Sequence, residues 1–166
     1  EFSCLGTVGD DLYINDVHLL EQECTDNATE MDPAAVTDLL LNVDDPSQVR
    51  AWIHSHADMQ CFWSSTDEDC IEGLANESFL VSIVVNKAGD YRCRVDLFQP
   101  IRLTIDKVPV VVRVRSPRLT ADCRREFDRK VREVPLQLLI GTSLGNTDHD
   151  EMTEFSRWAN SRGGWR

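Results

Sequence analysis

The alternation and periodicity of apolar positions over the first 115 residues predict a mixed succession of strands and helices. Residues 3–8 and 12–20 alternate as strands do, and the Gly9-Asp10 pair between them has turn chemistry, so this segment predicts a β-hairpin. Asp32 as an N-cap and Pro33 at the first helical position predict that a helix follows. Its buried face would consist of Val36, Leu39, Leu40 and Val43.

The next segments continue this alternation of element types. A short strand is predicted over residues 49–56, after the DDPS sequence at 44–47 has ended the first helix. Ser65 and Glu68 have the spacing of a capping box, which predicts a second helix beginning near Ser65 or Thr66. Three further strands are predicted at 79–85, which is an apolar run broken only by Ser82, at 91–97 and at 108–114.

This order of elements predicts an α/β (α+β) fold, in which a mixed central β-sheet is flanked by helices. We expect the domain to span residues 1–115. Residues 116–166 then form a helical C-terminal extension, with a charged amphipathic helix at 120–133 and a second helix at about 148–159.

Composition and charge narrow the range of partners. The 29 acidic residues outnumber the 17 basic ones, and the net charge of -12 disfavours binding to nucleic acid or to an anionic membrane surface. The six cysteines include no CxxC pair, and the sequence has no apolar run of about 18 residues and no signal-peptide pattern. We therefore expect a cytoplasmic protein with reduced thiols.

Candidate chemistry is concentrated in the segment WIHSHADMQCFWSSTDED, residues 52–69. His54 and His56 lie two positions apart on a predicted strand, so both imidazoles can reach one ion, and Asp67 in the first turn of the following helix can fold back to it. Two histidines at this spacing also occur for packing alone. Together with Asp67 they would leave one position of a tetrahedral zinc open, as in catalytic sites.

Zinc at such a site would lower the pKa of a bound water to about 7 and polarise a carbonyl group. Ser64, three residues before Asp67, is placed to direct its hydroxyl at the oxygen where negative charge develops, an interaction worth about 3 kcal/mol. His54, His56 and Asp67 are therefore the candidate ligands of one catalytic Zn²⁺, and Ser64 is a candidate catalytic residue.

The spacing HSH, seven residues, Ser, two residues, Asp resembles the HxHx7SxxD signature of the JAMM (MPN-plus, JAB-domain) zinc metalloproteases. The opening EFSCLG, the DVHLLEQ segment and LVSIVVN are also similar to the prokaryotic branch of that family. The resemblance covers about residues 1–115. It departs from the family where Ala57 replaces a usual proline and Cys4 a common glycine.

The resemblance implies an MPN/JAB-type, cytidine-deaminase-like fold and a deubiquitinase-like isopeptidase activity. The substrate would be a conjugate or precursor of ubiquitin or a ubiquitin-like protein, cut at the amide bond after its C-terminal glycine. In the family a glutamate on the first strand acts as general base, and Glu1 matches it by position.

Two other functions fit the same sequence. One is a noncatalytic MPN scaffold or interaction module, since many domains of the family have lost their metal ligands. The other is a phage-type JAB peptidase that acts on non-ubiquitin peptides, or a processor of small sulfur-carrier precursors. A zinc nucleobase deaminase is disfavoured because its HxE and PCxxC pattern does not occur.

Overall fold

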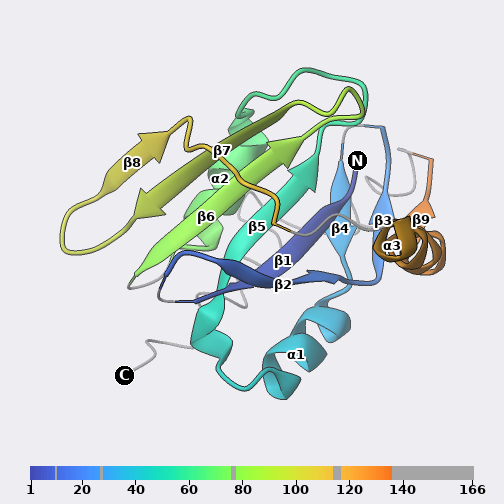
Figure 1. Cartoon of the computed structure of the whole chain (residues 1–166), viewed down its shortest axis with the longest axis horizontal. Coiled ribbons are helices and arrows are strands. Elements are labelled where there is room, and N and C mark those ends of the chain that lie inside the picture. Colours follow the sequence, from blue (N-terminus) through green and yellow to red (C-terminus); the bar gives the residue numbers. More distant parts are fainter. Residues whose placement is uncertain (10, 27, 76–77, 114–116, 136–166) are drawn as a thin grey trace, which may run out of the picture.

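A six-stranded mixed sheet forms the centre of the computed structural model, which describes residues 1–9, 11–26, 28–75, 78–113 and 117–135. Its strand order is β2-β1-β5-β6-β7-β8 (Figure 1). β5 and β6 pair in parallel, and the other neighbours are antiparallel. The strands are β1 (Ser3–Val8), β2 (Ile14–Leu19), β5 (Val49–Ser55), β6 (Phe79–Val85), β7 (Tyr91–Leu97) and β8 (Leu103–Asp106). The predicted mixed α/β fold and the hairpin at its start are confirmed.

A second, three-stranded sheet was not predicted. It consists of β3 (Gln22–Cys24), β4 (Thr29–Met31) and β9 (Val131–Glu133) in the order β4-β3-β9. β3 pairs antiparallel with β4 and parallel with β9. Residues beyond the expected domain boundary at 115 therefore share a sheet with residues near the start of the chain.

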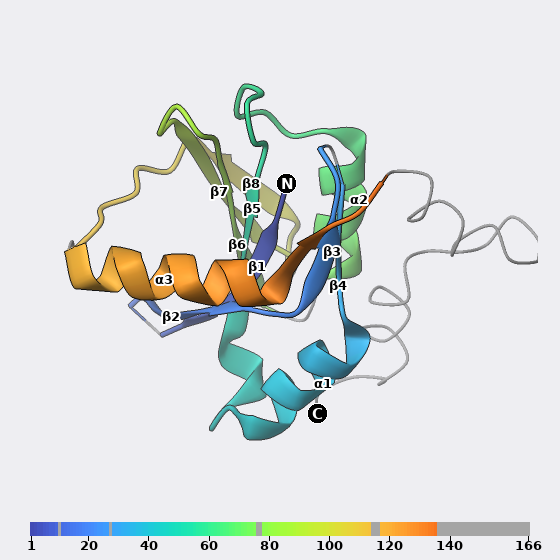
Figure 2. The ribbon, with the colours of Figure 1, turned by 90° about the vertical axis from the view of Figure 1, so that its right-hand side faces the viewer.

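Two helices cover one face of the central sheet (Figures 1 and 2). α1 (Pro33–Asn42) begins as predicted, with the side chain of Asp32 accepting a hydrogen bond from the backbone nitrogen of Ala34. A short 3-10 helix, η1 (Pro46–Gln48), leads into β5, and α2 (Ser65–Gly73) follows it. The core on this face contains Leu5, Leu20, Val36, Trp52, Ile71 and Leu80.

On the opposite face of the sheet, one predicted strand does not form. Residues 108–113, predicted as a strand, form no strand in the structure, although Val108 and Val110 pack on the core formed by Ala51, Val81, Ile83 and their neighbours. The backbone nitrogen of Val108 donates to the Cys93 carbonyl of β7 at 2.9 Å, but Pro109 has no backbone N–H with which to continue a ladder. The edge strand beside β7 is instead β8, whose residues are all exposed.

The helix predicted at 120–133 is present as α3 (Pro117–Lys130), but residues 131–133 form β9 instead of its last turn. α3 lies beside β2 and the small sheet (Figure 2). The Phe127 ring packs edge-to-face on Phe2, and Lys130 Nζ donates to the Leu19 carbonyl at 2.6 Å. The helix predicted at 148–159 lies outside the described residues. Over the described ranges, no helix is both long and apolar enough to cross a bilayer.

Candidate metal centre

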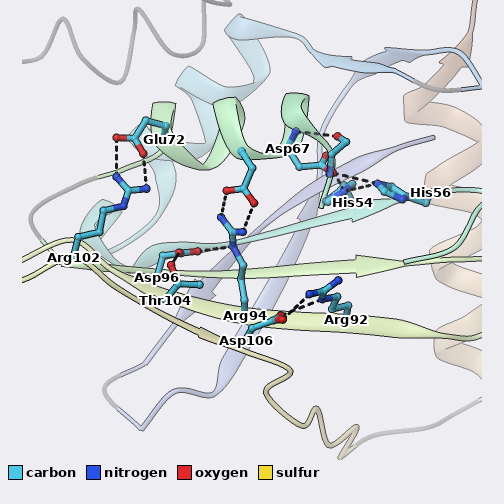
Figure 3. Close-up of polar contacts among 12 residues, drawn as sticks. His54, His56, Asp67, Glu72, Arg92, Arg94, Asp96, Arg102, Thr104 and Asp106 are labelled. Atoms are coloured by element: carbon cyan, nitrogen blue, oxygen red, sulfur yellow. Dashed lines mark hydrogen bonds and ion pairs between the residues drawn. The ribbon is translucent and has the colours of Figure 1, made fainter. Parts of the chain in front are cut away.

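Three buried side chains converge where β5 ends and α2 begins (Figure 3). His54 is in β5, His56 follows its last residue, and Asp67 is in the first turn of α2. The two Nε2 atoms are 3.1 Å apart; Asp67 Oδ1 is 3.1 Å from His54 Nε2, and Asp67 Oδ2 is 3.4 Å from His56 Nε2. The three residues that the sequence singled out as ligands thus face a common point.

The ionisation of these groups suits a cation. Burial would raise the pKa of Asp67, but hydrogen bonds from His54 and Ser64 outweigh it and lower this pKa to about 2. Burial lowers the pKa of His54. Both shifts favour a carboxylate beside a neutral imidazole, which are the protonation states in which these side chains bind a metal.

The spacing of the donor atoms fits one small ion. Zn–N and Zn–O bonds of about 2.0–2.1 Å at tetrahedral angles place neighbouring donor atoms about 3.3 Å apart, close to the three distances above. Nδ1 of His56 lies 3.0 Å from the carbonyl oxygen of Gln60. A carbonyl only accepts, so Nδ1 carries the proton and the Nε2 lone pair points at the common site. The residues therefore fit a bound divalent ion.

The surroundings of the His54 ring hold it with Nε2 facing the same point as Nε2 of His56. The imidazole stacks on the Trp52 indole with centroids 4.1 Å apart and 15° between the planes, and Trp63 lies at 6.0 Å. Nδ1 of His54 is buried without a hydrogen-bond partner among the described residues. Packing and the Nε2 contact with Asp67, rather than a hydrogen bond at Nδ1, therefore orient this ring.

Ser64 is the N-cap of α2, a role that the sequence pattern gave to Ser65. The capping box of α2 is formed by Ser64 and Asp67, not by Ser65 and Glu68. The backbone nitrogen of Ser64 donates to Asp67 Oδ2 at 2.7 Å, and Ser64 Oγ accepts from the backbone nitrogen of Asp67 at 3.2 Å. Because Oγ acts as the acceptor here, its O–H can still donate elsewhere. The cap therefore holds the Asp67 carboxylate against the histidines.

Glu1 lies close enough to the site to interact electrostatically with His56 and Asp67. The register places it there, because Ser3 pairs with His54 and the backbone nitrogen of Ser55 donates to the Phe2 carbonyl at 2.9 Å. Burial is the main cause that raises the pKa of Glu1. The structure thus brings all five candidate residues to one region, while their catalytic roles stay predictions.

In the loop between His56 and Ser64, the residue after HSH has a backbone conformation that proline cannot adopt. Ala57 has a φ of 46°, in the left-handed region, whereas a proline ring fixes φ near about -65°. The Ala57 nitrogen also donates to Ser55 Oγ at 3.1 Å, a bond that proline lacks. Phe62, further along this loop, is 43% exposed and packs edge-to-face on His56 at 4.8 Å, so it borders the site from the solvent side.

No protein-family model matches the chain, and the curated proteins contain no match to it. The site is therefore defined by its own geometry. Two imidazoles and one carboxylate are a donor set that zinc and other first-row divalent ions accept, so the structure supports a metal site without specifying the ion.

Proposed function

We propose that this chain is a zinc-dependent metalloprotease of the JAMM type. The observation that carries the proposal is the convergence of His54 Nε2, His56 Nε2 and an Asp67 carboxylate oxygen on one point, with donor distances that suit a single tetrahedral ion. Three protein ligands would leave a fourth position for water or substrate, which is the arrangement of catalytic rather than structural zinc sites.

Bound zinc would supply Lewis acidity that activates water and polarises the scissile carbonyl. The chain's own residues would handle the protons and the developing charge. The Glu1 carboxylate, made more basic by burial, accepts a proton from the attacking water and returns it to the leaving amine. The Ser64 hydroxyl donates to the oxygen that becomes negative, while its backbone nitrogen keeps Asp67 in place.

The substrate that we propose is the amide bond after the C-terminal glycine of ubiquitin or a ubiquitin-like modifier, in a conjugate or a precursor. The similarity of the HxHx7SxxD spacing to that of the family supports this substrate. All six cysteines are free thiols, which supports the reducing cytoplasm as its compartment.

The test combines metal content with cleavage. The protein is saturated with Zn²⁺, freed of excess ion, and analysed for bound zinc and for hydrolysis of a panel of ubiquitin-like conjugates and linear peptides. We expect one zinc per chain and cleavage of a conjugate, lost on chelation and restored by zinc. His54→Ala, His56→Ala and Asp67→Asn remove zinc and activity together, whereas Glu1→Gln slows cleavage with zinc retained.

Each other outcome points to a different function. Zinc below 0.1 per chain under replete conditions would leave the noncatalytic scaffold as the better explanation. Bound zinc with cleavage of peptides but of no conjugate would favour a phage-type peptidase. An Asp67→Asn variant that cleaves like the wild type would contradict the ligand assignment.

A further inference from the structure

A buried arginine connects the sheet to the helix that carries Asp67. Arg94 in β7 is 5% exposed and points toward α2 (Figure 3). Its two terminal nitrogens form a bidentate pair with the Glu68 carboxylate at 2.5 and 2.7 Å. Glu68 is the residue that follows Asp67 in the chain, so this pair attaches the first turn of α2 directly to β7.

Arg94 is also held from the sheet, by a neighbouring residue of β7. Nε of Arg94 donates to Asp96 Oδ2 at 2.8 Å, and Asp96 is 1% exposed. The other oxygen of Asp96 accepts from Thr104 Oγ1 of β8 at 2.5 Å. With Nε and both terminal nitrogens engaged, the guanidinium has one orientation, and that orientation sets the position of Glu68.

A second contact leads from Arg94 to the histidines. Its guanidinium lies 4.8 Å from the centre of the Trp63 ring, which in turn lies 6.0 Å from the His54 ring. Trp63 directly precedes the cap residue Ser64. Arg94 therefore supports the site on two sides, through the helix that carries Asp67 and through the indole beside His54.

We propose that Arg94 is a positioning residue for the metal site, which holds Asp67 and His54 at ion-binding distance through Glu68 and Trp63. The proposal rests on the metal site of the proposed function. Residues that orient metal ligands typically change metal affinity by about 10- to 100-fold when they are replaced.

An exposed pair one turn further along α2 supplies a matched control. Glu72 and Arg102 form a similar two-point contact, at 2.8 and 2.5 Å, with side chains 61% and 49% exposed. Replacing Glu72 removes the same charge as replacing Glu68, from the same helix, and replacing Arg102 removes the same charge as replacing Arg94, from the segment after β7. Neither change touches Trp63, Asp96 or the first turn of α2.

The experiment measures the zinc affinity of the folded protein by competition with a chromogenic chelator, and the visible spectrum of the Co²⁺-loaded protein. Arg94→Met is compared with Arg102→Met, and Glu68→Ala with Glu72→Ala. We expect about 10- to 100-fold weaker zinc binding and an altered Co²⁺ spectrum for Arg94→Met. A several-fold loss is expected for Glu68→Ala, and no change for either control.

The sign of the Arg94→Met effect separates positioning from simple electrostatics. Removal of a positive charge near the site would by itself strengthen cation binding, whereas loss of positioning weakens it. If Arg94→Met does not fold, Glu68→Ala is compared with Glu68→Gln: both lose the charge, but only glutamine can still accept a hydrogen bond from Arg94, so weaker zinc binding by Glu68→Ala than by Glu68→Gln reports positioning.

Two results would overturn the proposal: Arg94→Met or Glu68→Ala binding zinc within twofold of its control, or Arg94→Met binding zinc more tightly than the wild type. If the wild-type chain itself binds no zinc, the metal-site assignment fails instead. The two failures are therefore distinguishable.

Discussion

At the scale of single residues, Ser64 combines two functions that substitutions can separate. Its Oγ caps α2 by accepting from the Asp67 nitrogen, and its O–H is the proposed donor to substrate. Ser64→Ala loses both, so we expect a loss of stability of about 1 kcal/mol and about 10²- to 10³-fold slower cleavage. Ser64→Gly loses the hydroxyl too, but glycine at an N-cap costs only a few tenths of a kcal/mol.

Urea unfolding and initial cleavage rates, measured on both variants and on Ser64→Thr, give the test. Ser64→Thr keeps the capping oxygen and the hydroxyl, so it should stay close to the wild type in both measurements. If Ser64→Gly cleaves as fast as the wild type, the hydroxyl has no catalytic role and Ser64 serves only the cap.

The candidate ligands could be predicted residue by residue, because a strand projects every second side chain to the same side. This rule placed His54 and His56 on one side, and a helix start placed Asp67 nearby, but packing alone also explains such an arrangement. The resemblance to the HxHx7SxxD signature singled out the three residues as ligands. Arg94 could not be found in this way. Its partner Glu68 is 26 positions away in sequence, and a strand reading YRCRVDL gives no sign that Arg94 is buried while Arg92 is more exposed.

At the scale of secondary-structure elements, the side chain of Gln22 joins the two sheets as a strand neighbour would. Its Oε1 accepts from the Ser3 nitrogen at 2.8 Å, and its Nε2 donates to the carbonyls of Ser3 and Leu20 at 2.8 and 3.0 Å. Ser3 is also the residue opposite His54 in the ladder between β1 and β5. Gln22 therefore anchors the end of β1 that carries Glu1.

Gln22→Leu keeps the size of the side chain but leaves the buried nitrogen and carbonyl of Ser3 without these partners. Each unsatisfied buried group costs about 1–3 kcal/mol, so for the two groups we expect a loss of about 2–6 kcal/mol in the free energy of unfolding. Chemical denaturation measures this loss. A Gln22→Leu variant as stable as the wild type would contradict the anchoring role.

The elements that the sequence predicted correctly are those with a long pattern of their own. The helix at Pro33 has both an N-cap and a periodic face, and six of the seven residues of the strand at 79–85 are apolar. β3, β4 and β9 have three residues each, too few for an alternation to be recognised. At 108–113 only Val108 and Val110 pack on the core, whereas Val111 and Val112 are exposed, and Pro109 prevents regular pairing, so the apolar run alone was misleading.

At the scale of the whole molecule, described residues after 115 pack against the first residues of the chain. We predicted residues 116–166 as a helical extension, and within its described part α3 and β9 contact the start of the chain through Phe127, Lys130 and the pairing of β9 with β3. The short strand β9 could not be foreseen, because parallel pairing with β3 joins segments more than 100 residues apart.

The rate at which cysteines are alkylated tests whether α3 and β9 pack on the start of the chain, and this test does not depend on catalytic activity. Cys4 in β1 is within electrostatic reach of Glu126 and Lys130 of α3, and burial raises its pKa to about 12. Cys24 is buried in β3, opposite Glu133 of β9. Cys93 is buried in the central sheet, where burial raises its pKa to about 11, and Cys123 is exposed on α3. Alkylation requires an accessible thiolate, so docking of α3 and β9 should protect Cys4 and Cys24.

We therefore expect iodoacetamide to label Cys123 first in the native protein, with Cys4, Cys24 and Cys93 protected, as peptide mass spectrometry would show. Phe127→Ala removes the ring that packs on Phe2 and should loosen α3, so that Cys4 and Cys24 are labelled several times faster while Cys93 stays protected. Faster labelling of all three would mean that the variant unfolds globally. Rapid labelling of Cys4 and Cys24 in the wild type would instead mean that residues 117–133 behave as an independent extension, with the N-terminal part folded without them.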